Sequence, residues 1–395
     1  MPKKYLQDVA LKLINWFNSE GRLINEAGVL DQAIVDRLLA TGIPLYRYTT
    51  GMPSLHPMVD SFSTLWEEGK GITFRQFKRA DFPNLGVSTN AFQTAYKTGG
   101  NVRCRLDGPP EEDIFDILAE LRAEGCTDYL VIALPFSDGA NKAVGYATRA
   151  AGGFSDDHIF LLKQIRFAMA ATLAVRYLRH MASTVMNTYV GPTAGQRVLD
   201  GEIKRGTGET IRAALWFSDL KGFTVLSESL DSESLLELLN AYFDAITGAI
   251  EANGGEVLKF IGDAVLAIFS PPNADEAAAA QNALSAARAA MSSLADINRK
   301  RHGENLTEIQ YGIALHFGDV FYGNVGGKTR LDFTVIGPAV NLASRIEGLT
   351  RDLGRNILVS QNFADLHPEK FSSKGHFSLK GIAEEAEVFV PTKLR

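Results

Sequence analysis

The sequence predicts an α+β protein in which a domain with an antiparallel-centred sheet follows a separate α/β domain. A chain of 395 residues is too long for one compact domain. Helix and strand patterns also restart after about residue 208, in an order (β-αα-ββ-α-ββ) that fits an antiparallel-centred sheet with helices better than a parallel doubly wound one.

The composition is that of an ordinary globular protein, with 46% hydrophobic and 22% charged residues. The net charge of −6 does not indicate a nucleic-acid partner. The longest apolar run, residues 167–175, has nine residues, whereas a membrane span needs about 20. Cys104 and Cys126 give neither a disulfide framework nor a metal-ligand spacing. We therefore expect a cytoplasmic protein without a membrane span.

The first domain is expected over residues 1–155. Residues 4–18 place their apolar side chains on one helical face, and residues 129–135 form an apolar run typical of a buried strand. A turn at 138–142 and a returning strand at 143–147 complete a hairpin. Ser155 is placed to cap a following helix.

A helical linker is expected over residues 156–206. The helix at about 156–188 is apolar on more than one face, so something must cover it. We expect its C-terminal half to form a parallel dimer stalk, and the alternative is that the helix folds onto its own domain. A glycine-spaced connector follows from Gly191, with GEIKRG at 201–206.

The second domain is expected over residues 207–395. A strand at 211–217 is followed by an amphipathic helix at 232–252 and by a hairpin around Gly262. The remaining expected elements are a helix at about 275–300, strands near 309–316, 319–324 and 331–336, and a helix from about 338.

Two aspartates stand where backbone geometry exposes them. Asp219 ends the apolar strand, and Asp263 lies at the tip of the hairpin. If the two strands are neighbours, both carboxylates meet at one edge of the sheet. Hard oxygen ligands of this kind suit Mg²⁺ or Mn²⁺, so the pair predicts a site for two divalent metal ions.

Two glycine-containing segments invite a phosphate-binding interpretation. Backbone N–H groups of residues 221–224 lie between a strand and a helix, where they could hold a polyphosphate. Residues 323–329 resemble a P-loop, but the spacing is one residue short and no strand-to-helix pattern surrounds them. We expect a hairpin there.

Thr334, Asn341 and Arg345 form a third cluster. Asn341 and Arg345 are four residues apart on an expected helix, so they share a face. An amide and a fixed cation suit a ribose and a charged phosphoryl group, although a solvated helix face has the same spacing.

Four motifs carry a resemblance to a known family. They are FSDLKGFT (217–224), KFIGDAVLAIF (259–269), HFGDVFYGNVG (316–326) and LDFTVIGPAVNLASRIEGL (331–349). In this order they resemble class III adenylate/guanylate cyclases over about residues 205–391. The resemblance implies a ferredoxin-like palm and a reaction that closes a nucleoside triphosphate into a 3′,5′-cyclic nucleotide.

The resemblance also implies roles for single residues. Asp219 and Asp263 would bind the two metal ions, with the Leu220 carbonyl close by. Asn341 and Arg345 would orient the ribose and stabilise the pentavalent phosphorus. The residues that would contact the rest of the substrate are Lys259 and Thr334 at the adenine, Gly222, Phe223 and Thr224 near the phosphates, and Lys380 at the terminal phosphates.

ATP is the substrate that this pattern favours. Lys259 can donate to adenine N1 and Thr334 can accept from the exocyclic amine, whereas guanine presents the reverse pattern. A Thr at position 334 marks the subgroup of adenylate cyclases often stimulated by bicarbonate. The alternatives are a guanylate cyclase and a catalytically inactive cyclase that acts as a binding module.

In this family one domain supplies the metal aspartates and a second supplies the base and ribose contacts. All six roles are filled within this chain, so the resemblance implies a homodimer. The first domain is similar to GAF-type sensors over residues 128–165, which implies an unidentified small-molecule ligand. Asn141, Lys142 and Phe154 match part of a GAF motif, whereas His56 and Cys126 are lone candidate ligand contacts.

Overall fold

A computed structural model describes residues 3–78, 90–108, 115–137, 139–382 and 384–392. The chain divides into two compact units, Met1–Val185 and Met186–Arg395. Each unit builds its own sheet, so the expected two-domain α+β organisation is present.

The first unit contains, among the described residues, a six-stranded antiparallel sheet in the order β3-β2-β1-β6-β5-β4. Strands β5 and β6 pair as the expected hairpin requires, whereas residue 138 of its turn lies outside the described residues. The strands are β1 (Arg47–Pro53), β2 (Val59–Glu67), β3 (Gly71–Lys78), β4 (Val102–Arg105), β5 (Asp128–Pro135) and β6 (Asn141–Thr148).

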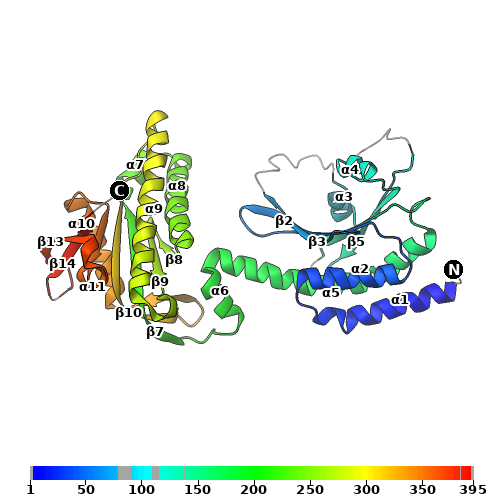
Figure 1. Ribbon diagram of the computed structural model, residues 1–395, viewed down its shortest axis with the longest axis horizontal. Helices are drawn as coiled ribbons and strands as arrows, with labels where there is room; N and C mark the ends of the chain where they lie inside the picture. The colour runs from blue at the N-terminus through cyan, green and yellow to red at the C-terminus, as the bar shows by residue number, and fades with distance from the viewer. Residues whose placement is uncertain (1–2, 79–89, 109–114, 138, 383, 393–395) are drawn as a thin grey trace. The chain divides into compact units, whose positions relative to one another are not determined.

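Helices cover both faces of this sheet (Figure 1). Alternation along β5 explains why: Leu130, Ile132 and Leu134 pack with one group of helices, whereas Tyr129 and Val131 pack with the other. The first group is α1 (Lys3–Asn18), α2 (Ala27–Ala40) and α5 (Asp156–Val190), and the second is α3 (Ala91–Thr98) and α4 (Ile117–Ala123), with a short 3₁₀ turn at Gly21–Leu23.

Helix α5 is the long helix expected from the sequence. Its apolar side, including Ile165 and Leu173, is buried in the core of the first unit as far as Tyr177. The first unit therefore extends to residue 185, past the expected boundary at 155. Intramolecular packing covers this part of the helix, as in the alternative to a dimer stalk, whereas Val175 and Leu178 on another side stay exposed.

Helix α5 is also the one described helix that is long and apolar enough to cross a membrane. Its most apolar window has a mean hydropathy of 1.3, and 44% of that window is buried within the structure. Core helices of globular domains meet the same criterion, so the absence of a membrane span stays a prediction.

The second unit has, among its described residues, an eight-stranded sheet with the order β13-β14-β12-β10-β7-β9-β8, and β11 pairs with β10. The central β10-β7-β9 pairs are antiparallel, and β12 joins β10 in parallel. The strands are β7 (Gly208–Leu220), β8 (Glu256–Ile261), β9 (Ala264–Phe269), β10 (Tyr311–Gly326), β11 (Leu331–Ile336), β12 (Ile357–Ser360), β13 (Phe371–Phe377) and β14 (Ala386–Pro391).

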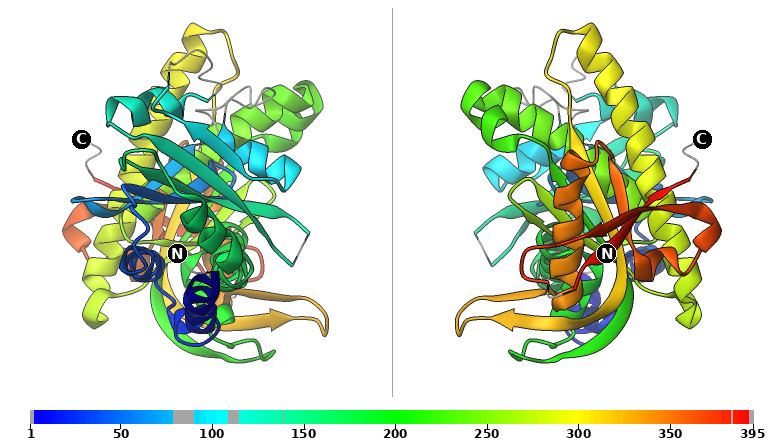
Figure 2. Two further views of the ribbon diagram at one scale, coloured as in Figure 1. Left: turned by 90° about the vertical axis from the view of Figure 1, so that its right-hand side faces the viewer. Right: turned by 90° about the vertical axis from the view of Figure 1, so that its left-hand side faces the viewer.

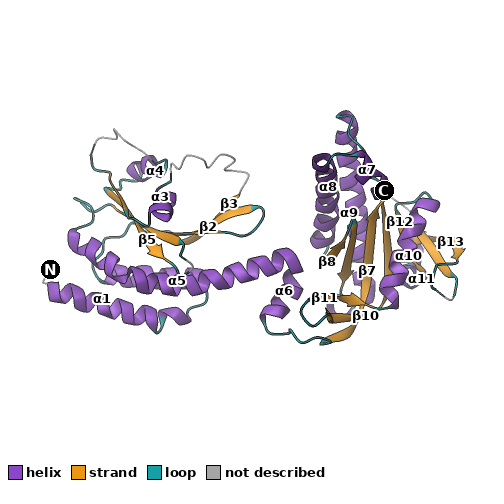
Figure 3. Ribbon diagram, turned by 180° about the vertical axis from the view of Figure 1, so that it is seen from behind, coloured by secondary structure: helices purple, strands orange, loops and turns teal. Residues whose placement is uncertain are grey.

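Helices also cover both faces of this second sheet (Figure 3). Trp216 of β7 packs with the helices that carry Tyr242 and Leu284, whereas its neighbour Leu215 packs with Ala343 on the opposite face. The helices are α6 (Pro192–Leu199), α7 (Phe223–Ser229), α8 (Ser232–Ala252), α9 (Glu276–Gly303), α10 (Pro338–Asp352) and α11 (Gln361–Ala364), with 3₁₀ turns at Pro272–Ala274 and Pro368–Lys370.

Strand β10 is longer than the sequence suggests. The strands expected near 309–316 and 319–324 are one strand, because Gly318 stays paired with Ala213 of β7 instead of forming a turn. Its far end forms a hairpin with β11 (Figure 2). The P-loop-like residues 323–329 lie in this hairpin, as expected.

The connector after α5 packs firmly on this hairpin. Residues 192–199 form α6, and Arg197 lies over the rings of Tyr322 and Phe333, at 5.5 and 5.2 Å from their centroids. The side-chain amide of Asn324 donates to the carbonyl of Glu202 at 2.6 Å. The GEIKRG segment is therefore fastened at both ends, since the Gly206 N–H donates to the Asn324 carbonyl at 2.9 Å.

Candidate active site

The carboxyl groups of Asp219 and Asp263 lie together. Asp219 is the penultimate residue of β7, and Asp263 lies in the turn between β8 and β9. Strands β7 and β9 are neighbours, with Ser218 opposite Val265. The side chains are close enough to share a hydrogen bond. The expected convergence of the two carboxyl groups is therefore present.

Local backbone geometry sets both aspartates at the sheet edge. Gly262, beside Asp263, has a φ of +65°, a left-handed conformation that other residues adopt only with strain. On the Asp219 side, Gly222 has a φ of +78° and precedes α7. The Asp219 carboxylate accepts the Leu220 N–H at 3.0 Å, which holds the side chain at the end of the strand.

Ionisation of Asp219 beside Asp263 is unfavourable in the protein without a bound cation. Burial raises the pKa of Asp219 to about 7, and the hydrogen bond to Asp263 and its negative charge add to the shift. The negative charge of Glu347 contributes in the same direction. An acid surrounded by other acids resists ionisation until a cation arrives. The pair therefore has the character of a cation site.

Glu347 is a member of the cluster that sequence reasoning missed. It lies on α10 and is 8% exposed, and burial raises its pKa. The Thr350 hydroxyl donates to its carboxylate at 3.2 Å. The sequence could have indicated it, because Glu347 lies on the same helical face as Ala343 and Thr350. That face is otherwise buried, and an acid on a buried face is unusual.

The described residues contain no group of three or more His, Cys, Asp and Glu side chains arranged to hold a metal ion. Two carboxylates are nevertheless a sufficient protein contribution for Mg²⁺, which usually takes its other ligands from phosphates and water. The donor set of Asp219, Asp263 and the Leu220 carbonyl fits that pattern.

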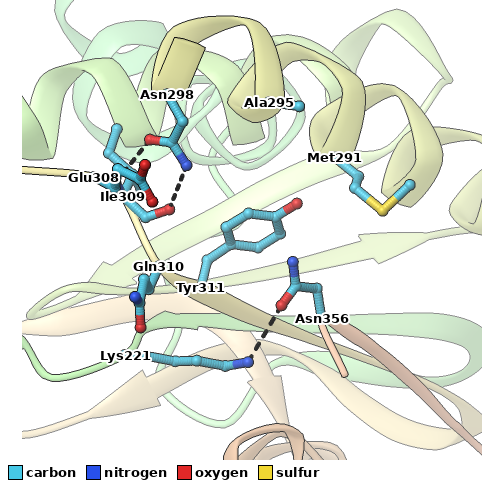
Figure 4. Close-up of a pocket in the computed structure, with 9 residues that line it drawn as sticks. All are labelled: Lys221, Met291, Ala295, Asn298, Glu308, Ile309, Gln310, Tyr311 and Asn356. Carbon is cyan, nitrogen blue, oxygen red and sulfur yellow. Dashed lines mark hydrogen bonds between the residues drawn. The ribbon is translucent and has the colours of Figure 1, made fainter. Parts of the chain in front are cut away.

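The segment 221–224 is anchored differently from the expected phosphate cradle. The Lys221 ammonium donates to the Arg355 carbonyl at 3.2 Å. It also donates to the Asn356 side chain at 3.3 Å (Figure 4). It lines a cavity of about 300 Å³ that includes neither aspartate. Phe223 and Thr224 begin α7, which has only seven residues. Their contact with phosphates stays a prediction.

The two expected base-reading residues have different environments. Lys259 on β8 pairs with Asp332 on β11, with 3.2 Å between Nζ and Oδ2. Thr334 is two residues further along β11, so it shares a face with Asp332. Thr334 is 3% exposed, and its hydroxyl has no hydrogen-bond partner among the described residues. Buried hydroxyls are normally paired, so the unpaired Thr334 hydroxyl is an exception.

Asp332 was also missed by sequence reasoning. The alternation of β11 placed it beside Thr334, but its pairing with Lys259 depends on the approach of β8 to the hairpin. Asp332 therefore ties the Lys259 side chain of β8 to β11, the strand that carries Thr334.

The remaining candidates make no hydrogen bond or ion pair with these groups among the described residues. Asn341 and Arg345 are exposed on α10, one turn from each other. Pro338 occupies the first position of that helix, where a proline is tolerated. Lys380 is exposed after β13, the edge strand furthest from β8, so the structure does not bring it to the aspartates.

The GAF-like candidates have structural partners. The Phe154 N–H donates to buried Asp128 at 2.9 Å, and the Asn141 amide donates to the Tyr96 carbonyl at 3.3 Å. The ring of His56 accepts the Met58 N–H. Cys126 is packed in the core under α3 and α4, where burial raises its pKa to about 11. Ser155 accepts the His158 N–H and caps α5 as expected.

The second unit is similar in sequence to known proteins. Residues 208–391 match the family model of the adenylate and guanylate cyclase catalytic domain. The adenylate cyclase of Anabaena cylindrica is 35% identical over 205 residues, covering 52% of this chain and 39% of that protein. Adenylate cyclase 1 of Rhizobium meliloti (strain 1021) is 35% identical over 144 residues, covering 36% of this chain and 22% of that protein.

The crystal structure of the adenylyl cyclase CyaB from P. aeruginosa is 30% identical, with a TM-score of 0.41 and coverage of 47% of this chain and 97% of that chain. This chain spans less than half the length of either curated relative. The matched residues lie within the second compact unit and include Asp219, Asp263, Lys259 and Thr334. Residues 208–391 are therefore a class III adenylate and guanylate cyclase catalytic domain.

Proposed function

We propose that the chain is an adenylate cyclase that converts ATP to 3′,5′-cyclic AMP and pyrophosphate. The observation that carries the proposal is the meeting of Asp219 and Asp263 within the matched domain, with the pKa of Asp219 raised to about 7. The names of the relatives, two of them adenylate cyclases, support the choice of reaction.

Different residues of the chain have different roles in the proposed reaction. Asp219, Asp263 and the Leu220 carbonyl would hold two divalent ions, Mg²⁺ or Mn²⁺. Such ions lower the pKa of the ribose 3′-hydroxyl and neutralise the phosphates. Arg345 offers a fixed cation to the α-phosphate, and Asn341 orients the ribose. The 3′-oxygen bonds to the α-phosphorus, the bond to pyrophosphate breaks, and the hydroxyl proton passes to water.

The choice of ATP rests on the base-reading residues. Lys259 donates to adenine N1, and the unpaired Thr334 hydroxyl accepts from the exocyclic amine. A guanylate cyclase is the second candidate, because a hydroxyl can also donate to the carbonyl of guanine. The matched family model covers both substrates.

The deciding experiment is an assay of the purified chain with ATP and with GTP, each with Mn²⁺ and with Mg²⁺. We expect cyclic AMP to dominate and an Asp219→Ala variant to be inactive. Asp244→Asn, an exposed acid on α8, serves as the control that keeps activity. A preference for GTP would replace adenylate by guanylate cyclase, and equal background activity in wild type and Asp219→Ala would favour a binding module.

We further infer a homodimer with two sites at its interface. Exposed apolar residues lie at the ends of β8 and β11, the strands that carry Lys259 and Thr334: Phe260 is 52%, Ile261 46% and Ile336 45% exposed. Such a patch is typical of an interaction surface. Arg345 is exposed as well, as expected for a side chain that reaches a partner's substrate.

Mixing two inactive variants tests this arrangement. Asp219→Ala and Arg345→Ala proteins should regain activity together, because one of the two sites in a heterodimer keeps both residues. Mixing two preparations of Asp219→Ala is the control. No recovery, despite subunit exchange seen with differently labelled proteins, would exclude a shared site. The first unit would act as the sensor that regulates this dimer.

A further inference from the structure

A second cavity lies entirely within the first unit. It has a volume of about 490 Å³, within the range of small-molecule sites, roughly 300–1,000 Å³. Its walls are strands β1, β2 and β3, the start of α2, and the C-terminal part of α5. It is therefore on the same side of the sheet as α2 and α5, opposite α3 and α4.

The lining combines positive charge with aromatic surface. Arg75, Arg176 and Arg179 line the cavity, and no aspartate or glutamate is among its lining residues. Phe62 and Tyr177 supply the apolar part. Phe74 of β3 faces α2, so alternation turns the Arg75 side chain to the other face of the sheet, and the cations on the cavity side are Arg176 and Arg179. Two guanidinium groups without a carboxylate among the lining residues favour an anion.

Arg176 is the best-placed of these cations. Its Nη1 donates to the carboxylate of Asp31 and to the carbonyl of Ala27, both at 3.2 Å. Asp31 is fully buried and also accepts the Tyr48 hydroxyl at 3.1 Å. The buried acid thus fixes the guanidinium group at the wall of the cavity. Nε and Nη2 of Arg176 have no partner among the described residues, so the fork keeps donors for a ligand.

The other charged groups add to this preference. Arg179 is exposed and makes no ion pair with any residue that the structure describes. His180 contacts the Phe62 ring edge-on, with 4.8 Å between centroids. Burial and the Arg176 charge lower the pKa of His180, so the positive charge near pH 7 comes from the arginines.

We propose that this cavity, the Arg176 pocket, binds a small amphipathic organic anion. Its carboxylate or phosphate group would accept from Arg176 and Arg179, and its apolar body would pack on Phe62, Phe74 and Tyr177. Charge-assisted bonds to a guanidinium fork give such a group affinity and orientation. The proposal names a ligand class for the proposed sensor unit, but binding there does not depend on cyclase activity.

The probe is 8-anilinonaphthalene-1-sulfonate, an aromatic anion whose fluorescence rises on binding, titrated into the full chain. Arg179→Gln should weaken binding of the anion at this site about tenfold, as expected for one charge-assisted hydrogen bond. Lys163→Gln, an exposed cation on α5 outside the cavity, should change nothing. The neutral analogue N-phenyl-1-naphthylamine should bind equally to all three proteins.

Two further arms complete the test. Arg176→Lys keeps a cation beside Asp31 but removes the planar fork, so it should weaken the anion in a protein whose unfolding temperature shows that it is folded. Displacement of the probe by benzoate or by phenyl phosphate identifies which acid group is preferred. Equal affinity of the anion for all variants, or failure of both competitors to displace it, would overturn the proposal. Cyclase activity enters none of these measurements, so a failure of the proposed enzyme would be seen separately.

Discussion

The buried acids of the two units have opposite electrostatic environments. In the first unit, fully buried Asp128 accepts from Arg103 at 2.8 Å and from the Phe154 N–H at 2.9 Å. Asp31 is likewise paired, with Arg176. In the second unit, Asp219 faces Asp263, and Glu347 lies near enough to raise its pKa further.

The paired acids of the first unit stabilise the fold, whereas the acids of the second unit lack a cation and are suited to bind one. A buried carboxylate with a guanidinium partner is costly to disturb, because removing the partner leaves an uncompensated charge. A carboxylate beside other carboxylates is strained in the protein alone and is relieved by a cation. The contrast therefore predicts which substitutions destabilise the chain and which only inactivate it.

The largest effect is expected from Arg103→Ala. This change leaves the Asp128 carboxylate buried without its cation and should lower the free energy of unfolding of the first unit by about 3 kcal/mol. Urea denaturation measures the change. Arg105→Ala on the same strand is the matched control, since its partner Asp107 is exposed, and it should cost less than about 1 kcal/mol. Similar losses in the two variants would remove the distinction between a buried and a surface pair.

The second prediction concerns pH and the stability of the metal-free second unit. Because the pKa of Asp219 is raised from 3.8 to about 7 in the fold, the folded state holds its proton over a range in which the unfolded state has lost it. Stability from this group is full below about pH 4 and is lost as the pH rises towards 7.

Thermal unfolding of the metal-free protein between pH 5 and pH 8 measures this effect. Asp219→Asn cannot titrate and should flatten the decline, without losing stability at pH 8. Added Mn²⁺ should stabilise wild type at pH 8 and leave Asp219→Asn almost unchanged. A wild-type decline that persists in full in Asp219→Asn would assign the titration to another group.

The smallest effect on stability is expected from Thr334→Val. The hydroxyl has no partner to lose, so the free energy of unfolding should change by less than about 0.5 kcal/mol. The kcat/KM for ATP should nevertheless fall about three- to tenfold, the value of one hydrogen bond. Thr127→Val is the matched comparison, because that hydroxyl donates to the Ala150 carbonyl at 2.6 Å and its loss should cost about 1 kcal/mol. The reverse order of stabilities would contradict the contrast between the units.

Local patterns predicted much of the catalytic site. Asp219 and Asp263 lie at a strand end and a hairpin tip, features that the adjacent residues define by themselves. Glu347 and Asp332 were missed because their neighbours come from distant strands: Glu347 reaches the site from α10 across β10, and Asp332 meets Lys259 73 residues away.

The limit of prediction from sequence is clearer in the first unit. Its strands and helices follow from alternation and helical periodicity, but the length of α5 that it buries depends on α1 and α2 far earlier in the chain. The Arg176 pocket collects residues from five separate segments, from Asn25 to Ser183. No sequence motif joins them, because only the folded sheet and helix bring them to one cavity.

The connector that is fastened to the β10–β11 hairpin has a practical consequence for protease sensitivity. Lys204 and Arg205 are exposed trypsin sites between two anchors, the Glu202 carbonyl and the Gly206 N–H, which both bond to Asn324. Arg197, at the start of the same connector, rests on Phe333, the residue next to Thr334. A nucleotide that orders the hairpin should therefore slow tryptic cleavage after residues 204 and 205. The cleavage rate would then report whether a nucleotide is bound near Thr334.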